Sequence, residues 1–419
     1  MLDKKKSILY LRADICAQEL KAGGSVAHTI GVIKGFCDEG YEVICALAPS
    51  ISMVKSLPVR ELINLKNPSV LSFLRWKLNC FLSTFIFTWQ TIGLFKRYAI
   101  GCIYQRHTLL NCTGVLLSML KKVPLILEYN GSEVWADENW SRKTIVSLHW
   151  LKRKVEEFNL CYAQYIIVVS EALQEELITR GIRADKILVN PNGVDTDLLD
   201  PDKLVQDRER IREQLGIEQK FVFGFIGTFS VWHGIEMLGM MIPAIIKQQP
   251  SAHFLLIGDG PLKESLYNTL TKNNVDPGCF TFAGLIPQDK ARGYLAACDA
   301  FLSPTQPNAD GSRFFGSPTK LFEYLSMGKP VIASDLEQLA EVIKPAITLS
   351  NDVGEVNQEV GFLAQPKNVQ DFIHAACLLA SYDEKKRATM GSNARQKAIA
   401  KHTWQHHVYN IISYVRELS

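Results

Sequence analysis

One short segment in the second half of the chain brings together a glycine, a helix start, a lysine and a glutamate. Residues 314–324 read FFGSPTKLFEY, so we predict a helix with Ser317 as its N-cap and Pro318 as its first residue. The amino end of such a helix binds anions, and Lys320 adds a cation one turn in. Glu323 lies one turn further, where its carboxylate can accept two hydrogen bonds from the vicinal hydroxyls of a ribose. The alternative is an ordinary surface ion pair between Lys320 and Glu323.

Two glycine turns upstream follow apolar runs and precede helix patterns. The first reads GTFSVWHG at 227–234, and His233 can donate to a phosphate oxygen beside the helix end that follows. The alternative is a histidine packed on Trp232 with a backbone partner. The second turn reads GDGP at 258–261. Turns at the carboxyl ends of parallel strands line the ligand crevice of an open sheet, although Asp259 can also serve only to cap its turn.

The first half of the chain carries two weaker signals of the same kind. Gly23 and Gly24 follow the first apolar run and precede a helix pattern from Val26, which lets the backbone approach a ligand beside a helix amino end. The spacing matches neither GxGxxG nor a Walker loop, and alone it predicts only a loop-to-helix turn. The second signal, LEYNGSE at 127–133, places polar residues at the carboxyl end of an expected strand, facing the crevice.

The elements that would position these residues alternate along the chain. Short apolar runs separated by helix patterns indicate parallel strands buried on both faces, and hence an α/β doubly wound architecture. The expected strands are 8–11, 42–47, 125–129, 165–169, 222–226, 253–257, 280–283, 300–303 and 330–333. A charge-rich break at 198–220 is expected to link a first domain, residues 1–200, to a second, residues 201–402. A last helix, 403–419, has one apolar face that must be buried against another surface.

The composition excludes several classes of protein. The chain has 419 residues, of which 47% are hydrophobic and 21% charged, enough for two or three packed domains. A formal net charge of +3 does not suggest a nucleic-acid binder. Ten cysteines without zinc-type spacing, and no signal-peptide pattern, indicate free thiols in a reducing cytosol. The sequence DTD at 195–197 resembles a metal-binding motif, but the preceding Asn-Gly indicates a turn, so we predict no metal site.

Charge and hydropathy raise the question of a membrane. Residues 1–110 hold 14 Lys and Arg against 7 Asp and Glu, and the stretch 78–95 has no charge but six Asn, Gln, Ser and Thr residues. This stretch is long enough to raise the question of a transmembrane helix, yet its polar side chains are costly in lipid. We expect a helix within 69–107 that touches the membrane surface, with Trp76 and Trp89 at the interface, or equally a plain core helix. A chance charge bias on a solvated surface is the alternative.

Taken together, these motifs resemble family 4 of the retaining nucleotide-sugar glycosyltransferases, which have the GT-B fold. The matching segments, in order along nearly the whole chain, are 23–24, 169–171, 190–195, 227, 232–234, 258–261, 317–324 and 328–335. The resemblance implies two Rossmann-like domains facing across a cleft. It also implies that the terminal helix crosses back to the first domain and that the second domain binds the nucleotide.

The resemblance also implies roles for single residues. Glu323 would bind the ribose, and Gly24 would offer its N–H to the donor phosphate. The residues expected to bind the donor are Gly23, Gly24, Gly227, Thr228, His233, Gly258, Gly316, Ser317, Thr319, Lys320, Leu321 and Glu323. Those expected to act in catalysis are Asn130, Glu133 and Glu323. Neither a metal ion nor a cofactor is implied, because the nucleotide sugar is itself the substrate.

Several positions depart from the family pattern. The family has two acidic residues eight apart, and the first falls on Phe315, for which Asp310 is the candidate substitute. Thr228 and His233 stand where the phosphate loop usually has Arg and Lys. Asn130 stands where a strand-end histidine is common.

The activity implied is retaining transfer of a sugar, of the hexosyltransferase class, from a nucleotide diphosphate donor to a saccharide. The acceptor is expected to be a lipid-linked or cell-surface polysaccharide precursor, in the cytoplasm or peripherally on the inner face of the membrane. The protein would position the reactants, stabilise the leaving diphosphate and exclude water by domain closure. Two alternatives stay open: a sugar-nucleotide 2-epimerase on the same fold, and a non-catalytic subunit that binds a sugar nucleotide or a partner transferase.

Overall fold

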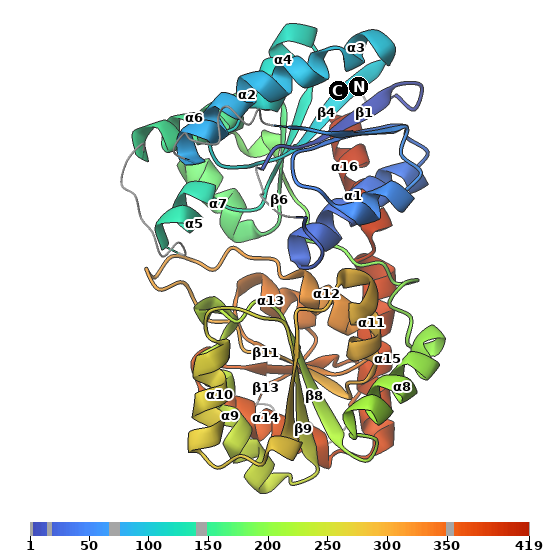
Figure 1. The fold of residues 1–419 in the computed structure, drawn as a ribbon, viewed down its shortest axis with the longest axis vertical. Coiled ribbons are helices and arrows are strands. Elements are labelled where there is room, and N and C mark those ends of the chain that lie inside the picture. The colour runs from blue at the N-terminus through green and yellow to red at the C-terminus, as the bar shows by residue number, and fades with distance from the viewer. Residues whose placement is uncertain (1–2, 15–18, 67–75, 140–148, 349–355, 419) are drawn as a thin grey trace. The chain divides into compact units, whose positions relative to one another are not determined.

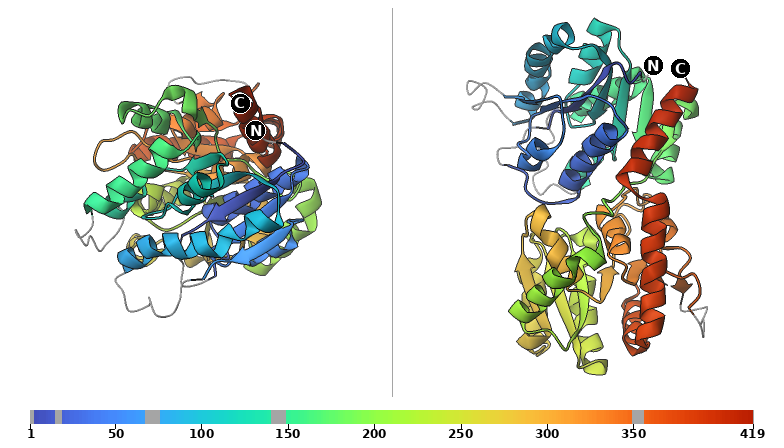
Figure 2. Two further views of the ribbon diagram at one scale, coloured as in Figure 1. Left: turned by 90° about the horizontal axis from the view of Figure 1, so that it is seen from above. Right: turned by 90° about the vertical axis from the view of Figure 1, so that its right-hand side faces the viewer.

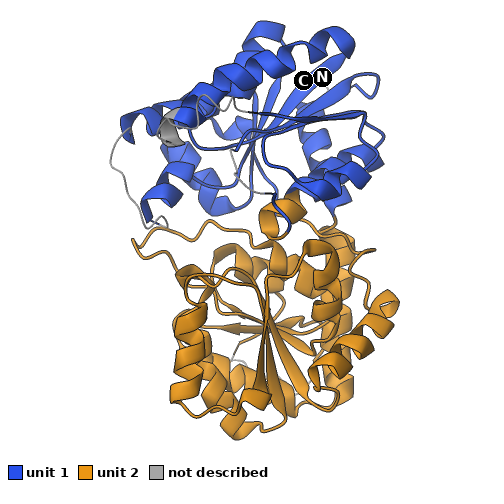
Figure 3. Cartoon of the chain, viewed as in Figure 1, with its two compact units in different colours: residues 1–21, 29–191, 404–419 blue, residues 22–28, 192–403 orange. Residues whose placement is uncertain are grey.

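The computed structural model describes residues 3–14, 19–66, 76–139, 149–348 and 356–418. Contacts within the chain divide it into two compact units, coloured separately in Figure 3. Unit 1 comprises residues 1–21, 29–191 and 404–419, and unit 2 comprises residues 22–28 and 192–403. Each unit contains a seven-stranded sheet with helices packed on it (Figure 1), which confirms the α/β doubly wound architecture.

The sheet of unit 1 is parallel throughout, with the order β3-β2-β1-β4-β5-β6-β7. Its strands are β1 (Ser7–Arg12), β2 (Val43–Leu47), β3 (Glu61–Asn64), β4 (Ile100–Arg106), β5 (Leu125–Tyr129), β6 (Tyr165–Val168) and β7 (Ile187–Val189). The strand order reverses between β1 and β4, so ligands are expected at the carboxyl ends of these two strands. Arg12 and Arg106 are register partners at those ends.

The helices of unit 1 include the terminal one. They are α1 (Gly24–Asp38), η1 (Ser52–Ser56), α2 (Trp76–Ile92), α3 (Leu94–Arg97), α4 (Thr113–Lys121), α5 (Glu133–Asn139), α6 (His149–Tyr162), α7 (Glu171–Thr179), η3 (Ala184–Lys186) and α16 (Trp404–Glu417). The first residues of α1, up to His28, group with unit 2. Figure 2 shows α16 beside α1, and a Cβ on Gly31 would lie 2.1 Å from the Trp404 ring. Glycine therefore allows the two helices to pack closely, and the apolar face of α16 is buried.

The sheet of unit 2 is also parallel, with the order β10-β9-β8-β11-β12-β14-β13. Its strands are β8 (Phe221–Ile226), β9 (Ala252–Ile257), β10 (Phe280–Gly284), β11 (Ala300–Ser303), β12 (Val331–Ser334), β13 (Ile347–Thr348) and β14 (Gly361–Ala364). Here the order reverses between β8 and β11, which makes the carboxyl ends of those strands the expected ligand position.

The helices of unit 2 begin within the segment that the sequence suggested as a linker. They are η4 (Pro201–Leu204), α8 (Val205–Leu215), η5 (Val231–His233), α9 (Ile235–Gln248), α10 (Lys263–Lys272), η6 (Pro277–Cys279), α11 (Gln288–Ala296), α12 (Thr319–Ser326), α13 (Glu337–Ile343), α14 (Val369–Ser381) and α15 (Glu384–Lys401). Residues 198–220 are thus mostly helical. Arg208 and Arg212 of α8 bind Asp299 at 2.5 and 3.1 Å, so the charge run serves packing within unit 2.

The uncharged stretch of the first half forms α2 and α3, which are separated by Gly93. Among the described residues, no helix is both long and apolar enough to cross a membrane. Residues 69–75, which belong to the surface suggested for membrane contact, lie outside the described residues.

Candidate active site

Tyr324 fixes helix α12 against the point where the strand order of unit 2 reverses. Its hydroxyl accepts a hydrogen bond from the backbone N–H of Ile226, at the end of β8, over 2.9 Å. Its ring stacks on Phe301 of β11, with ring centroids 4.0 Å apart and planes at 1°. Because Tyr324 contacts both strands, the amino end of α12 is held beside the 227–234 turn.

Lys320 lies in the first turn of α12 and is only 5% exposed. Its Nζ has no hydrogen-bond partner among the described residues. It lies instead 4.4 Å from the centre of the Phe225 ring. Burial lowers the pKa of Lys320 to about 7. The predicted alternative of a surface ion pair with Glu323 is therefore contradicted, and the unit contains a buried cation that an anion would stabilise.

His233 contacts the carbonyl oxygen of Thr228 through Nδ1, over 2.5 Å. A carbonyl can only accept, so Nδ1 carries the proton, and in the neutral ring Nε2 is an acceptor. Burial, and then the nearby Lys320, lower the pKa of His233 well below its ordinary value. The ring also lies against Trp232, with centroids 3.5 Å apart. His233 is therefore packed on Trp232 and hydrogen-bonded to the backbone, as the alternative in the sequence analysis had it. Its Nε2 can donate to a phosphate oxygen only when a bound ligand raises the pKa of the ring.

Helix α12 begins at Thr319, one residue later than the sequence predicted. Pro318 has extended backbone angles and is the N-cap, so Thr319 is the first helical residue and the predicted cap is corrected. The Ser317 hydroxyl instead accepts a hydrogen bond from the backbone N–H of Asn192, over 3.3 Å. Oδ1 of Asn192 also lies 2.6 Å from Nδ1 of His28, within unit 2. Since Pro318 makes no side-chain cap, no N-cap side chain blocks an anion from the amino end of α12.

The start of α1 meets the start of α12 within unit 2. A Cβ on Gly24 would lie 2.6 Å from Oγ1 of Thr319, which is closer than side chains pack. Gly23 precedes it with φ of +107°, a conformation that favours glycine. Two helix amino ends thus lie together, and the exposed Gly24 backbone can approach a ligand there.

Glu323 lies one turn after Lys320 and is 7% exposed. Its Oε1 accepts a hydrogen bond from Nε2 of Gln288, the first residue of α11, over 3.1 Å. Burial raises the pKa of Glu323, while the Gln288 hydrogen bond acts in the opposite direction. The Gln288 amide therefore orients a carboxylate that has further lone pairs available for hydroxyl groups.

Other residues expected to bind the donor have structural explanations. A Cβ on Gly258 would lie 2.0 Å from the carbonyl oxygen of Gly227, so Gly258 allows two turns to pack together. A Cβ on Gly227 would lie 3.3 Å from the His233 ring. The Leu321 side chain is fully buried in the core of unit 2, which leaves only its backbone for a ligand.

The departures from the family pattern lie in the loop before α12. Phe315 is half-buried and stacks with Phe314, with ring centroids 6.4 Å apart. Asp310 accepts hydrogen bonds from the N–H and hydroxyl of Ser312 at 3.0 and 2.6 Å, so its carboxylate serves a turn. Gly316 packs on Phe314, where a Cβ would lie 2.8 Å from the ring.

The acidic motif at 195–197 is also a turn. Oδ1 of Asp195 accepts hydrogen bonds from the backbone N–H groups of Asp197 and Leu198 at 3.2 and 3.0 Å. Within the described ranges, no group of three or more His, Cys, Asp or Glu residues could hold a metal ion.

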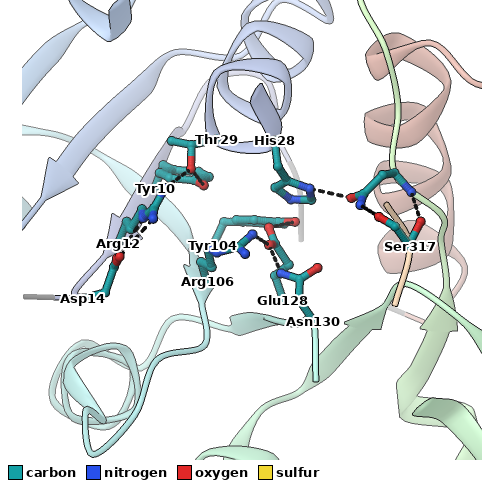
Figure 4. Close-up of polar contacts among 11 residues, drawn as sticks. Tyr10, Arg12, Asp14, His28, Thr29, Tyr104, Arg106, Glu128, Asn130 and Ser317 are labelled. Carbon is teal, nitrogen blue, oxygen red and sulfur yellow. Dashed lines mark hydrogen bonds and ion pairs between the residues drawn. The ribbon is translucent and has the colours of Figure 1, made fainter. Parts of the chain in front are cut away.

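In unit 1, the buried Glu128 of β5 gathers three donors (Figure 4). Nη1 of Arg106 lies 2.6 Å from its Oε1, and the Tyr104 hydroxyl donates to Oε2 over 2.9 Å. The amide nitrogen of Asn130 also donates to Oε1. With its nitrogen held in this way, Asn130 can present its carbonyl oxygen as an acceptor.

Glu133 is exposed and is the first residue of α5, where the helix dipole favours a carboxylate. The preceding residue, Ser132, donates its hydroxyl to the buried Glu156 over 3.1 Å, and Glu156 pairs with Arg180 at 2.9 Å. Nε2 of the buried His107 lies 3.5 Å from Glu156. Burial opposes ionisation of Glu156, but His107 and Arg180 hold its pKa below the ordinary value.

Sequence reasoning missed several polar residues at these positions. Arg12 of β1 is buried, pairs with Asp14 through Nε at 2.8 Å and donates to Thr29 at 2.9 Å (Figure 4). Arg12 closes an apolar run at a strand end, a signal that the sequence did contain, whereas Arg106 follows the polar Gln105. For Gln288 the sequence gives no signal, because its role depends on α11 lying beside Glu323.

Two family models match the chain in sequence order. The glycosyltransferase family 4 model matches residues 22–198, and the model of group 1 glycosyl transferases matches residues 220–381. The motif segments between 23 and 195 lie inside the first of these ranges, and those between 227 and 335 lie inside the second. The chain belongs to the family 4 glycosyltransferases.

Curated relatives of this family 4 glycosyltransferase are distant in sequence. A sulfoquinovosyl transferase of Arabidopsis thaliana is 24% identical over 70% of the chain, and the match spans 51% of that protein. An N,N'-diacetylbacillosaminyl-diphospho-undecaprenol alpha-1,3-N-acetylgalactosaminyltransferase of Campylobacter jejuni is 25% identical over 90% of the chain and 92% of its own length. The chain thus spans about half of the first relative and nearly all of the second.

Solved structures show that the family 4 glycosyltransferase has the GT-B fold. HepE of Anabaena, in complex with UDP-glucose, has a TM-score of 0.69 at 20% identity, covering 98% of this chain and all of that one. At this identity the likeness establishes the fold, two Rossmann-like units in one chain, which confirms the expected fold class.

Proposed function

We propose that the protein transfers a sugar from a nucleoside diphosphate sugar, and that unit 2 binds the donor. The observation that carries the proposal is the buried, unpartnered ammonium of Lys320 beside the amino ends of α12 and α1. An uncompensated buried charge is costly, and a diphosphate supplies the missing anion. The complex of Anabaena HepE with UDP-glucose supports this class of donor.

The nucleoside end of the donor is assigned to Glu323. Its carboxylate, held by Gln288, accepts hydrogen bonds from both ribose hydroxyls. His233 stands near Lys320 and gains a proton when the diphosphate arrives, which lets Nε2 donate to a phosphate oxygen. Gly24 contributes its backbone N–H, and Thr228 holds the His233 ring in place.

We propose that the transfer proceeds with retention of configuration. The acceptor hydroxyl attacks the anomeric carbon on the face from which the diphosphate leaves, and the departing phosphate oxygen takes the hydroxyl proton. Lys320 and the helix amino ends stabilise the charge that develops on the leaving group. The protein supplies positioning and electrostatics, without a covalent intermediate on a side chain.

The acceptor is assigned to unit 1, with Asn130 and Glu133 as the residues that bind its hydroxyls. We propose a saccharide on a lipid carrier, a precursor of a cell-surface polysaccharide. The Campylobacter relative, whose name gives a diphospho-undecaprenol acceptor, supports this class. The described cysteines are all free thiols, which supports a reducing, cytoplasmic compartment.

The first test measures nucleotide binding by thermal shift with UDP, GDP and ADP, and with their sugar conjugates. We expect stabilisation of the wild type by one nucleotide series and a clearly smaller shift for the variant Lys320→Met at the same nucleotide concentration. Lys272→Met, at an exposed lysine of α10, is the matched control and should bind normally. If no nucleotide stabilises the wild type, donor binding is refuted.

Turnover then separates transfer from the alternatives. With the best donor and a lipid-linked saccharide, we expect a glycosylated product whose anomeric configuration matches that of the donor. Isomerised nucleotide sugar without any acceptor would indicate an epimerase. Binding without turnover of any donor and acceptor offered would indicate a non-catalytic subunit.

A further inference from the structure

Helix α2 buries polar side chains alongside Cys80 and Phe87, while it exposes two aromatic side chains. Its buried side carries Ser83, Thr84 and Thr91, each with no exposed surface. Its outer side carries Phe85, which is 55% exposed, and Trp89, which is 77% exposed. A surface helix normally buries its apolar stripe and exposes its polar one, so the burial pattern of α2 requires a specific explanation.

The inward polar side is fully used in packing. The hydroxyls of Ser83 and Thr91 donate to backbone carbonyls of α2 itself, at 2.6 and 2.7 Å. Thr84 accepts from the backbone N–H of Cys112, over 3.2 Å, at the start of α4. The Asn111 side chain donates to Ser83 over 3.2 Å. Because these hydrogen bonds fix the rotation of α2, the aromatic side is held outward and cannot turn into the core.

The outward aromatic residues form a continuous stripe. Phe81, Phe85 and Trp89 follow one another at intervals of four, and the rings of Phe81 and Phe85 meet edge to face at 5.9 Å. Helix α4 runs beside α2 in Figure 1 and ends in the exposed Met119 and Leu120. We call Phe81, Phe85, Trp89, Phe95, Met119 and Leu120 the outer face. Phe85, Trp89, Met119 and Leu120 are exposed, and Phe81 and Phe95 are half-buried beside them. Clustered exposed apolar side chains mark interaction sites.

Basic residues predominate in the sequence around the outer face. Residues 62–127 contain eight Lys and Arg and no Asp or Glu, although Arg97 pairs with Glu61 and Arg106 with Glu128. Nζ of Lys121 lies 5.8 Å from the centre of the Phe95 ring, and Lys96 and Lys122 are exposed nearby in sequence. Aromatic side chains with a basic rim fit the interface of a bilayer that contains anionic lipids, where tryptophan sits at headgroup level and each lysine adds electrostatic attraction.

We propose that the outer face of α2 and α4 is the surface through which unit 1 docks on an anionic lipid bilayer. The helices lie on the membrane and do not cross it, in keeping with the absence of a spanning helix among the described residues. The biological role of this docking rests on the proposed function, since docking would bring the protein to a lipid-linked acceptor. Binding to a lipid surface can be measured whether or not the protein transfers a sugar.

The test is co-sedimentation of the full chain with vesicles of phosphatidylcholine, with and without phosphatidylglycerol. We expect binding only to the anionic vesicles, weakened by salt. The double variant Phe85→Ser/Trp89→Ser should reduce binding by at least about tenfold. Lys121→Gln/Lys122→Gln should reduce it by about fivefold for each charge removed. Trp150→Ser, at a tryptophan of α6 that is 71% exposed, is the matched control and should bind as the wild type does.

Two further measurements keep the outcome decisive. Thermal unfolding should show that the double variant is folded, and UDP-dependent stabilisation should be unchanged in it, because the outer face belongs to unit 1 and the donor residues to unit 2. Equal binding of wild type and double variant to anionic vesicles would overturn the inference. So would a wild-type dimer in light scattering that the double variant abolishes without any vesicle binding. In both cases, thermal stabilisation by nucleotides still tests the proposed sugar transfer independently of lipid binding.

Discussion

The ammonium of Lys320 lies over the Phe225 ring at 4.4 Å and has no hydrogen-bond partner among the described residues, although Glu323 follows one turn later on the same helix. Glu323 is bound instead by Gln288. The two charged residues of α12 are therefore kept apart, one with a free cation and one with an oriented carboxylate. A structural ion pair would have joined them, whereas a bound nucleotide diphosphate can use both.

Replacing Lys320 by methionine should separate stability from binding. Removal of an unpaired buried ammonium is expected to raise the free energy of unfolding at neutral pH by about 1–3 kcal/mol. The same change should lower kcat/KM by about 100-fold or more, because the leaving diphosphate loses its buried cation. Denaturant titration and steady-state kinetics on one preparation test both. A variant that is less stable and equally active would contradict the assignment.

The pH dependence of unfolding should report the same lysine. The pKa of Lys320 in the folded protein is about 7, below its value in the unfolded chain, so between pH 7 and the ordinary lysine pKa the unfolded state binds more protons. Stability should therefore rise with pH across this window, relative to Lys320→Met. The difference between wild type and variant, measured by denaturant titration at several pH values, should shrink as the pH rises. An unchanging difference would mean that Lys320 is not buried unpaired.

Donor affinity should show the opposite trend. A diphosphate favours the charged form of Lys320, so at pH above 7 binding takes up a proton, and affinity should fall by up to about tenfold per pH unit. A nucleotide sugar is the suitable probe because its diphosphate does not titrate in this range. Calorimetry in two buffers of different ionisation enthalpy would measure the proton uptake. In Lys320→Met the uptake through this residue should vanish.

The role of Glu323 can be tested against the ribose itself. Glu323→Gln should weaken binding of UDP by about 10- to 100-fold, the value of hydrogen bonds to a charged acceptor. Against 2′,3′-dideoxy-UDP, wild type and variant should bind equally, because the hydroxyls that Glu323 contacts are gone. If the thermal-shift assay shows that the protein binds ADP or GDP, the same comparison is made with that nucleotide and its 2′,3′-dideoxy form. A loss of the same size for both ligands would show a packing effect only.

The contact between Gly24 and Thr319 allows steric and ligand effects to be distinguished. Gly24→Ala places a Cβ 2.6 Å from Thr319 Oγ1, so we expect a loss of stability of about 1–3 kcal/mol. Thr319→Ala removes that oxygen, and the double variant should recover most of the stability. If the Gly24 backbone approaches the donor phosphate, donor binding stays weak in the double variant. Recovery of both properties would assign Gly24 to packing alone.

Asn130 should affect turnover without affecting the donor. Asn130→Ala removes one donor to Glu128 and the acceptor oxygen assigned to the acceptor substrate, so we expect kcat to fall by about 10- to 100-fold at unchanged nucleotide affinity. Gln164→Ala, whose side chain caps the backbone at Leu125 in the same unit, is a control for general loss of packing. A fall in nucleotide affinity would place Asn130 with the donor.

The sequence predicted the strands that are continuous apolar runs. All nine expected strands are present, with ends within one residue. It missed β3 and β14, which have only two or three consecutive apolar residues, β4, whose apolar run is interrupted by Gly101 and Gln105, and β7 and β13, which are only three and two residues long. Such reasoning detects a period of two or an unbroken apolar run of at least four residues, and none of these five strands has either.

The candidate site was predictable where one local segment carried it. The motif around Lys320 and Glu323 indicated a helix start and an anion site from neighbouring residues alone. The partners came from distant parts of the chain: Phe225 from β8 and Gln288 from α11. No local pattern reveals such pairs. The burial of Lys320 was equally hidden, because it depends on Tyr324 binding to β8 and β11.

The placement of α16 has a consequence for synthesis and for dissection of the protein. Unit 1 is built from the beginning of the chain and from Trp404–Glu417, with most of unit 2 inserted between them. During synthesis, unit 2 can therefore finish folding before α16 is available to cover the surface around Gly31 and Gly35 of unit 1. A single cut cannot yield unit 1 intact. An expressible version would have to splice residue 191 directly to residue 404.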